Sequence, residues 1–220
     1  MAVPDPRMID RCVEACAEAH QRLLAIADGL GDDDLRAPSL LPGWSRGHVL
    51  NHLRRNAIGF TGMCEAAMAG EQGLQYPGGP EQRNREIEEG AGDPAATLVA
   101  NLRVAVYGLE AAWFRGDGTM WAGSGVLASG SVIPISEVPF RRLRETVVHT
   151  TDLGLGHGWE EWPDLYVRME LERQKMAWAA SHPMGLTQLP AAAMALPEKQ
   201  RVAWLLQRTR VEGLPEGPGL

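Results

Sequence analysis

The chain has 220 residues, of which 45% are hydrophobic and 22% charged, the balance of an ordinary folded globular protein. Its formal net charge is −7 and it contains no basic run interleaved with aromatic residues, so we expect no nucleic-acid partner. The N-terminus lacks the pattern of a signal peptide, and no apolar stretch approaches the length of about 18 residues that spans a membrane. We therefore expect a cytoplasmic protein with no membrane partner.

Four long amphipathic helices are predicted in the first part of the chain, because apolar residues recur there at helical spacing after capping residues. These helices are expected over residues 5–30, 45–70, 93–114 and 136–154. Their expected N-caps are Asp5, Ser45, Asp93 and Ser136. The first helix should end before the acidic run at residues 32–34 and Pro38.

The remaining segments have the composition of loops or short helices. Residues 71–92, which include Tyr76-Pro77-Gly78-Gly79-Pro80, are predicted to be an exposed, mobile rim. Residues 115–135 are rich in Gly and Ser, and their apolar runs are too brief to support a sheet on their own. Two further helices are expected at 164–181 and 197–210. The predicted fold is mainly α, with a four-helix bundle at 1–158 and a short C-terminal extension at 159–220.

A possible metal site comes from two of the predicted helices. Glu145 and His149 are four residues apart, so a helix stacks them on one face with about 6 Å of rise between them. His52 lies on the inward side of the second helix, and facing helices of a bundle can bring three such side chains to one ion. Two nitrogens and one oxygen would leave a divalent metal such as zinc an open position. The alternative is that each is a solvated or hydrogen-bonded helix residue.

Other candidate residues are less specific. Asp152 continues the face of Glu145 and His149, either as a carboxylate that supports a ligand or faces substrate, or as a solvated residue. His48 could join His52 and His149 in a three-histidine site, or face the loops. Three arginines near the start of the fourth helix either form a solvated face or place one guanidinium at the mouth of the bundle to hold an anionic substrate. These are Arg141, Arg142 and Arg144.

The cysteines do not make a second site. Cys12 and His20 are separated by eight residues, about 12 Å along a helix, which is too far for one ion. Cys12, Cys16 and His20 are therefore expected to be packing or surface residues. With Cys64, the three cysteines are too few for a disulfide framework and lack the spacing of a structural zinc site.

Residues 41–53, Leu-Pro-Gly-Trp-Ser-Arg-Gly-His-Val-Leu-Asn-His-Leu, resemble the second-helix signature of the mycothiol-dependent maleylpyruvate isomerases, a family of DinB-like four-helix metalloproteins. Residues 144–154 are similar to the fourth-helix signature of that family, and residues 196–215 resemble its C-terminal ending. The resemblance implies a DinB-like bundle in which His52, Glu145 and His149 bind a divalent metal, such as zinc. Asp152 falls on the acidic position of the family and is expected to act in catalysis.

For function, the resemblance implies that the metal lowers the pKa of the thiol of mycothiol. The thiolate would add to the cis double bond of maleylpyruvate, the new single bond would rotate, and elimination would give fumarylpyruvate. Arg144 would hold a substrate carboxylate. The expected partners are a small-molecule thiol and an electrophilic substrate, and the chain would be a monomer or homodimer.

Two alternatives stay open at the level of sequence. A mycothiol S-transferase would use the same site to couple the thiol to a xenobiotic or biosynthetic electrophile, and a noncatalytic stress-response bundle would use the metal only to hold its helices. The chain also departs from the family pattern. Thr150 stands where the family commonly has a second histidine, and the C-terminal part is shorter than in the fuller members.

Overall fold

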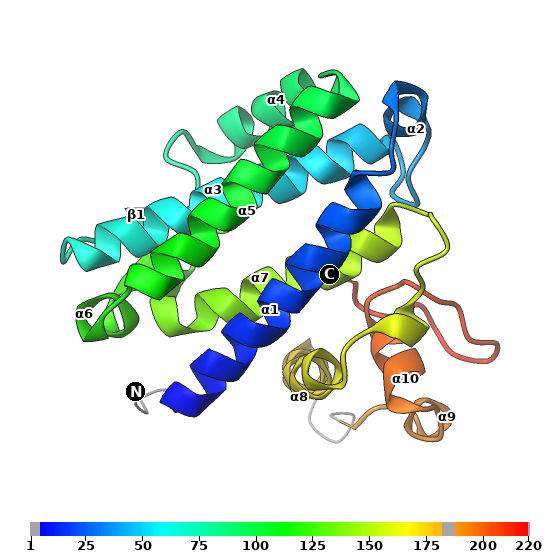
Figure 1. Cartoon of the computed structure of the whole chain (residues 1–220). Helices are drawn as coiled ribbons and strands as arrows, with labels where there is room; N and C mark the ends of the chain where they lie inside the picture. The colour runs from blue at the N-terminus through cyan, green and yellow to red at the C-terminus, as the bar shows by residue number, and fades with distance from the viewer. Residues whose placement is uncertain (1–4, 182–187, 220) are drawn as a thin grey trace. The chain divides into compact units, whose positions relative to one another are not determined.

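The computed structural model describes residues 5–181 and 188–219, and most of these residues are helical (Figure 1). The chain divides into two compact units, Met1–Gly154 and Leu155–Leu220. None of the helices in the part of the chain described here has the length and apolar character needed to cross a membrane. The prediction of a mainly α fold is confirmed.

Four long helices build the N-terminal unit, as the sequence predicts. They are α1 (Pro6–Ala27), α3 (Arg46–Met68), α5 (Ala95–Arg115) and α7 (Val138–Asp152). In Figure 1, α5 runs alongside α3 and α7 runs alongside α1, and both pairs are in contact. Fully buried aliphatic side chains from all four helices fill the space between them, which makes one bundle core: Leu23, Leu53, Leu102 and Val148.

The predicted caps are correct for the first two long helices. The Asp5 carboxylate accepts a hydrogen bond from the Arg7 amide, and Pro6 occupies the first turn of α1. The Ser45 hydroxyl accepts a hydrogen bond from the His48 amide at the start of α3.

The other two predicted caps are wrong. Helix α5 begins after Pro94. Its Ala95 amide donates a hydrogen bond to Asp32 Oδ1 at 2.7 Å, so the cap comes from a residue distant in sequence and not from Asp93. Asp32 belongs to the short helix α2 (Asp32–Arg36), whose acidic first turn is favoured by the helix dipole. Ser136 lies inside the 3-10 turn η1 (Ile135–Glu137), and α7 begins only at Val138.

The expectation of an exposed loop over residues 71–92 is also wrong, because α4 (Gly79–Ala91) forms there. After Pro80, which fits a first helical turn, the sequence consists mostly of residues with good helix propensity. The helix lies close against α3. A Cβ atom at Gly90 would approach the Asn51 side-chain nitrogen to 2.5 Å, and that nitrogen donates to the carbonyls of Glu86 and Ile87.

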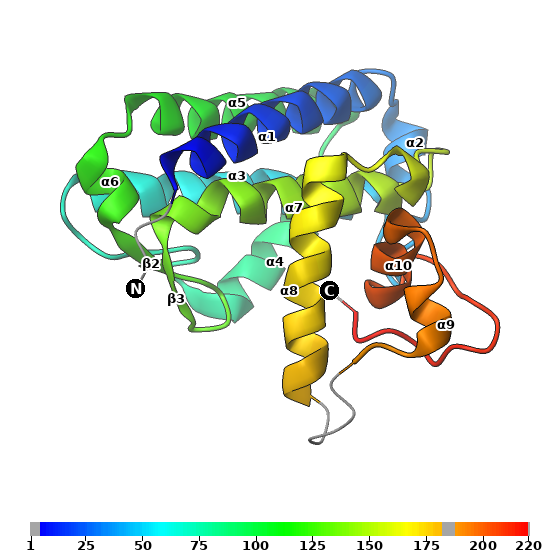
Figure 2. The same ribbon diagram turned by 90° about the horizontal axis from the view of Figure 1, so that it is seen from below.

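The Gly-rich segments contribute a small sheet where the sequence predicted none. Strand β1 (Gly73–Leu74) pairs in parallel with β2 (Ser124–Val126), which pairs antiparallel with β3 (Val132–Pro134). The strands β2 and β3 are visible in Figure 2, next to the short helix α6 (Gly118–Ala122). Each strand is too short to show a clear alternation of apolar and polar residues. The sequence pattern therefore could not predict that β1 pairs with β2 from a distant part of the chain.

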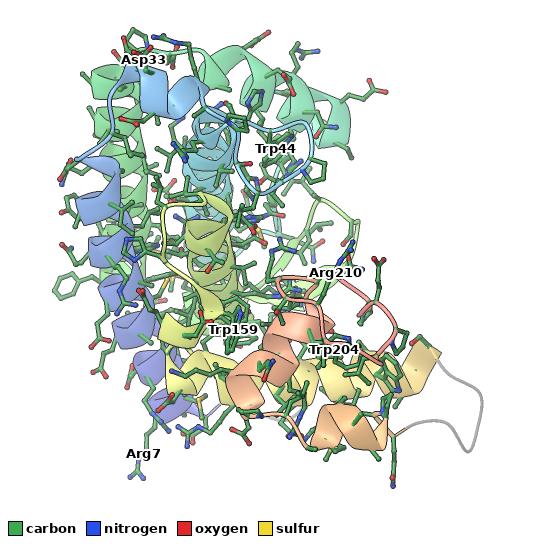
Figure 3. All side chains as sticks on the ribbon, turned by 90° about the vertical axis from the view of Figure 1, so that its right-hand side faces the viewer. Arg7, Asp33, Trp44, Trp159, Trp204 and Arg210 are labelled. Atoms are coloured by element: carbon green, nitrogen blue, oxygen red, sulfur yellow. The ribbon has the colours of Figure 1, made fainter. Side chains whose placement is uncertain are left out.

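The described part of the C-terminal unit combines helices with irregular segments. It contains η2 (Trp159–Glu161), α8 (Asp164–Ser181), α9 (Ala191–Met194) and α10 (Glu198–Leu205). The predicted 164–181 helix matches α8, whereas the helix expected to reach residue 210 ends at Leu205. The chain turns back after it, and the Trp204 indole, labelled in Figure 3, donates to the Pro215 carbonyl at 2.8 Å.

Candidate metal centre

The structure brings together the three side chains that the sequence singled out. Helix α3 supplies His52, and one face of α7 supplies Glu145 and His149. Glu145 Oε2 lies 2.9 Å from His52 Nε2 and 3.6 Å from His149 Nε2. One potential ligand atom from each residue lies within 4.8 Å of the other two. These atoms face one another closely enough to converge on a single ion.

The donor set suits a divalent metal of borderline character. Two imidazole nitrogens and a carboxylate oxygen are a combination found in catalytic zinc sites, where a fourth position stays open. His52 and His149 are 4% and 5% exposed, so an ion between them would be shielded from bulk water on the protein side. The role of these residues as ligands stays a prediction, which their arrangement supports.

Burial and mutual contacts set the charges of the cluster. Burial lowers the pKa of His52 to about 4, so its imidazole is neutral at pH 7. Burial would raise the pKa of Glu145, but the hydrogen bonds from His149 and His52 hold it well below the usual value. For His149 burial would lower the pKa, whereas the hydrogen bonds and charges of Asp152 and Glu145 raise it. A metal ion must therefore compete with a proton on His149.

Asp152 contacts the ring nitrogen of His149 that points away from Glu145. Its Oδ2 lies 2.8 Å from His149 Nδ1, and its side chain is completely buried. In the neutral imidazole this contact places the proton on Nδ1 and leaves Nε2, directed toward Glu145, available to a metal, as expected of a carboxylate behind a metal-binding histidine. Of the two active roles considered for Asp152, its burial favours support of a ligand over contact with substrate.

Arg83 is a residue of this centre that the sequence did not reveal. It lies on α4, and its Nη2 is 3.1 Å from His52 Nδ1. Its guanidinium also lies over the Tyr76 ring, with 5.6 Å between the carbon Cζ and the ring centroid. Since arginine only donates hydrogen bonds, His52 Nδ1 accepts this one in the present arrangement, and its Nε2 carries the proton directed at Glu145. A metal bound at Nε2 would need the proton on Nδ1 instead and would therefore release Arg83 from this contact. The only indication in the sequence was that Arg83 follows Pro80 within a run of residues that favour helix, which is a weak sign of a functional residue.

Trp44 supplies an aromatic wall to the same centre. It lies in the turn before α3 (Figure 3), and its ring centroid is 5.6 Å from that of His52 and 6.1 Å from that of His48. Trp44 belongs to the segment 41–53 that carries the family resemblance, but no chemistry was predicted for it.

The other candidates take structural positions. His48 contacts Ser45 through Nδ1 and Glu88 through Nε2, so the three-histidine site is not formed. Arg142 is fully buried and donates to His20, to Asn56 and to the Leu53 carbonyl, which rules out a place at an open mouth.

Arg141 pairs with Glu137. Arg144 is half-buried one residue before Glu145, which places its Cβ about 100° around α7 from that of Glu145. The proposed contact of Arg144 with substrate stays a prediction. Cys12, Cys16 and His20, which were expected to be packing or surface residues, are all buried, and His20 Nδ1 lies 2.8 Å from Glu110 Oε1.

Residues 16–154 match the family model described as the mycothiol maleylpyruvate isomerase N-terminal domain. The chain belongs to this family. The matched range makes up more than half of the chain and contains His52, Arg83, Glu145, His149 and Asp152, so membership in the mycothiol maleylpyruvate isomerase family covers the whole candidate centre.

Two solved structures resemble the chain and have the same fold. One is a mycothiol-dependent maleylpyruvate isomerase, with 25% identity and a TM-score of 0.74 over 78% of this chain and 71% of the other. The second is the H52A mutant of a mycothiol-dependent maleylpyruvate isomerase, with 24% identity and the same TM-score and coverage. No curated protein matches the sequence. The DinB-like four-helix architecture expected from the signatures is therefore present.

Proposed function

We propose that this protein is a mycothiol-dependent metalloenzyme that converts maleylpyruvate to fumarylpyruvate. The observation that carries the proposal is the cluster of buried His52, half-buried Glu145 and buried His149 inside the matched family domain. A solved structure with the same fold is an enzyme of that activity, at 25% identity. The reaction needs a nucleophile that adds reversibly to a carbon–carbon double bond, so the source of that nucleophile decides the mechanism.

The protein's own thiols are poor candidates for the nucleophile. Cys12, Cys16 and Cys64 are all buried. Burial raises the pKa of Cys12 to about 11 and that of Cys64 to about 12, and it also raises the pKa of Cys16. At neutral pH these side chains are thiols, and a thiol is a weak nucleophile. The nucleophile is therefore an external small-molecule thiol.

The three side chains of the cluster would hold a divalent metal, and zinc matches this set of ligands. Asp152 would keep His149 in the correct orientation. Such a metal, when bound, supplies a positive charge that lowers the pKa of a coordinated thiol. The low exposure of His52 and His149 limits access of water to that position, which favours thiol chemistry over hydrolysis.

Arg83 is the arginine best placed to bind an anionic substrate. Its guanidinium touches His52, and Tyr76 supports it from one side. A planar cation with several N–H donors matches the geometry of a carboxylate. Trp44 presents an aromatic face on the His52 side of the centre, which suits a flat conjugated substrate. We assign substrate orientation to Arg83, with Arg144 retained as a second candidate.

The test is a thiol-dependence assay. Purified, zinc-loaded protein is incubated with mycothiol and maleylpyruvate, and the products are identified by chromatography. We expect fumarylpyruvate to form only when thiol and metal are both present, with the thiol recovered unchanged. A variant with alanine at all three cysteines should retain the activity, because none of them is placed to act.

Other outcomes would support the alternatives. Stoichiometric consumption of thiol with accumulation of a conjugate would identify an S-transferase. A noncatalytic bundle would show no turnover, and the visible spectrum of its cobalt-substituted form would not respond to thiol. Turnover without thiol that disappears in the triple alanine variant would contradict the proposed mechanism.

A further inference from the structure

The outward face of α5 is unusual for a helix surface. Tyr107 is 41% exposed, Val104 72% and Phe114 92%. The exposed positions from residue 96 to residue 114 are all uncharged: Ala96, Thr97, Ala100, Asn101, Val104, Tyr107, Ala111 and Phe114. The charged residues that flank this stripe, Arg103 and Glu110, are partly buried and are paired with Asp28 and His20. The solvent side of an amphipathic helix normally carries charged residues. Because these positions are exposed, no other described element covers this face of α5.

The same helix carries a projecting side chain and a groove that could receive it. Phe114 projects near the C-terminal end of α5. Near the N-terminal end, a groove of about 510 Å³ lies between α5 and the end of α1, and Leu30, Val99 and Ala100 help to line it. Phe114 and Ala100 are 14 residues apart, or about 21 Å along the helix. An antiparallel pair of α5 helices would therefore place each Phe114 in the groove of the other copy.

The middle of the face is compatible with a two-fold axis. In a symmetric dimer, residues next to the axis meet their own copies, so a charge there would be repelled by the same charge on the partner. The midpoint between Ala100 and Phe114 is Tyr107, next to Gly108, and both are uncharged. Gly108 and Ala111 are small enough to let two helices approach, and a Cβ atom added at Gly108 meets nothing within 4 Å in this chain.

Charges at the two ends of the face are complementary in the same arrangement. The groove is lined by Asp28 and Asp32 but by only one cation, Arg103, which pairs with Asp28. Arg115 follows Phe114, and its side chain is 54% exposed and 3.6 Å from Glu65. Docking of Phe114 in the groove of a second copy would bring Arg115 toward this acidic end, and the two-fold axis would repeat the contact.

We propose that the uncharged face of α5 binds a second copy of this chain, so that the protein is an antiparallel, two-fold homodimer. Each copy contributes Phe114 and the groove at Ala100 once, which closes the assembly at two subunits and leaves no unpaired face for further growth. The proposal does not depend on the proposed enzymatic function, because its test needs neither metal nor substrate.

Sedimentation equilibrium across micromolar concentrations tests the proposal. We expect the wild-type chain to be a dimer and Phe114→Glu to raise the dissociation constant by about 30-fold or more, as for a central interface residue. Val132→Glu is the matched control, because Val132 is also an exposed apolar residue, 61% exposed, but lies on β3. This control should remain a dimer, and circular dichroism should show native helix content in both variants.

Cysteine cross-linking tests the orientation. Under mild oxidation Tyr107→Cys should form a disulfide-linked dimer, whereas Phe114→Cys should cross-link efficiently only when mixed with Ala100→Cys. The native cysteines are buried and should stay unreacted. A wild-type chain that stays monomeric, a dimer that Phe114→Glu leaves intact, or a monomer that binds lipid vesicles through this face would each overturn the proposal.

Discussion

Replacement of Asp152 by asparagine should separate the support of His149 from the other contributions to the metal centre. The carboxylate lies 2.8 Å from His149 Nδ1 and is completely buried, so asparagine keeps the shape of the side chain and removes its charge. Loss of such a supporting carboxylate typically weakens metal binding by about 10- to 100-fold, or about 1.4 to 2.7 kcal/mol. We expect a weakening in this range at pH 7.5, and a larger loss of turnover.

The pH dependence gives a second signature. In the wild type, the charges of Asp152 and Glu145 raise the pKa of His149, so a proton displaces the metal as the pH falls through that raised pKa. Without the Asp152 charge, the pKa of His149 falls toward that of an ordinary buried histidine. The variant should therefore bind metal more weakly at high pH, yet lose its remaining affinity at a lower pH than the wild type does.

Competition with a chromophoric chelator from pH 5 to 8 measures both effects. Glu110→Gln is the matched control, because Glu110 makes the same 2.8 Å contact with the Nδ1 of a buried histidine, His20, outside the cluster. It should leave metal affinity unchanged. Unaltered zinc affinity in Asp152→Asn, or an acid limit of binding that moves to higher pH, would refute the reasoning.

Three further predictions follow from other contacts. His52→Ala should reduce bound metal from one ion per chain to a small fraction, and full occupancy by elemental analysis of the folded variant would show that His52 is not a ligand. Arg83→Gln should raise the KM for an anionic substrate about tenfold or more through loss of a charged hydrogen bond, whereas Arg85→Gln, on the exposed side of the same helix, should not. Burial lowers the pKa of His20 from 6.5 in the unfolded chain to about 4 in the folded chain. As the pH falls from 6.5 toward 4, the unfolded chain therefore binds a proton that the folded chain does not, and the free energy of unfolding decreases. Between pH 7 and 5 the loss is about 2 kcal/mol, and chemical denaturation of His20→Gln should show a pH dependence smaller by that amount.

The sequence predicted that His52, Glu145 and His149 come together because the geometry of this cluster is mostly local. The spacing of Glu145 and His149 on one helix determines their relative position, and the inward side of α3 is readable from its apolar pattern, which placed His52. Only the docking of two long helices was needed to complete the cluster.

The contacts that the sequence did not reveal are those between distant segments. Arg83 reaches His52 because α4 packs against α3, and the Gly78-Gly79-Pro80 turn before it has the composition of a loop. Asp32 caps α5 from 63 residues away, a distance at which local capping patterns carry no information. In both cases a segment whose composition suggests a helix breaker, either the two glycines or the acidic run, lies next to a contact that forms only when distant helices pack together.

The burial of Arg142 has a consequence for how the bundle assembles. Its guanidinium, on α7, donates to His20 on α1 and to Asn56 and the Leu53 carbonyl on α3, and His20 in turn contacts Glu110 on α5. A cation removed from water without its partners costs several kcal/mol, so an intermediate that buries Arg142 without α1 or α3 would be unfavourable, and one without α5 would lose the contact of His20 with Glu110. The four long helices should therefore form in one cooperative step, and their slowest amide hydrogens should exchange through the same global opening.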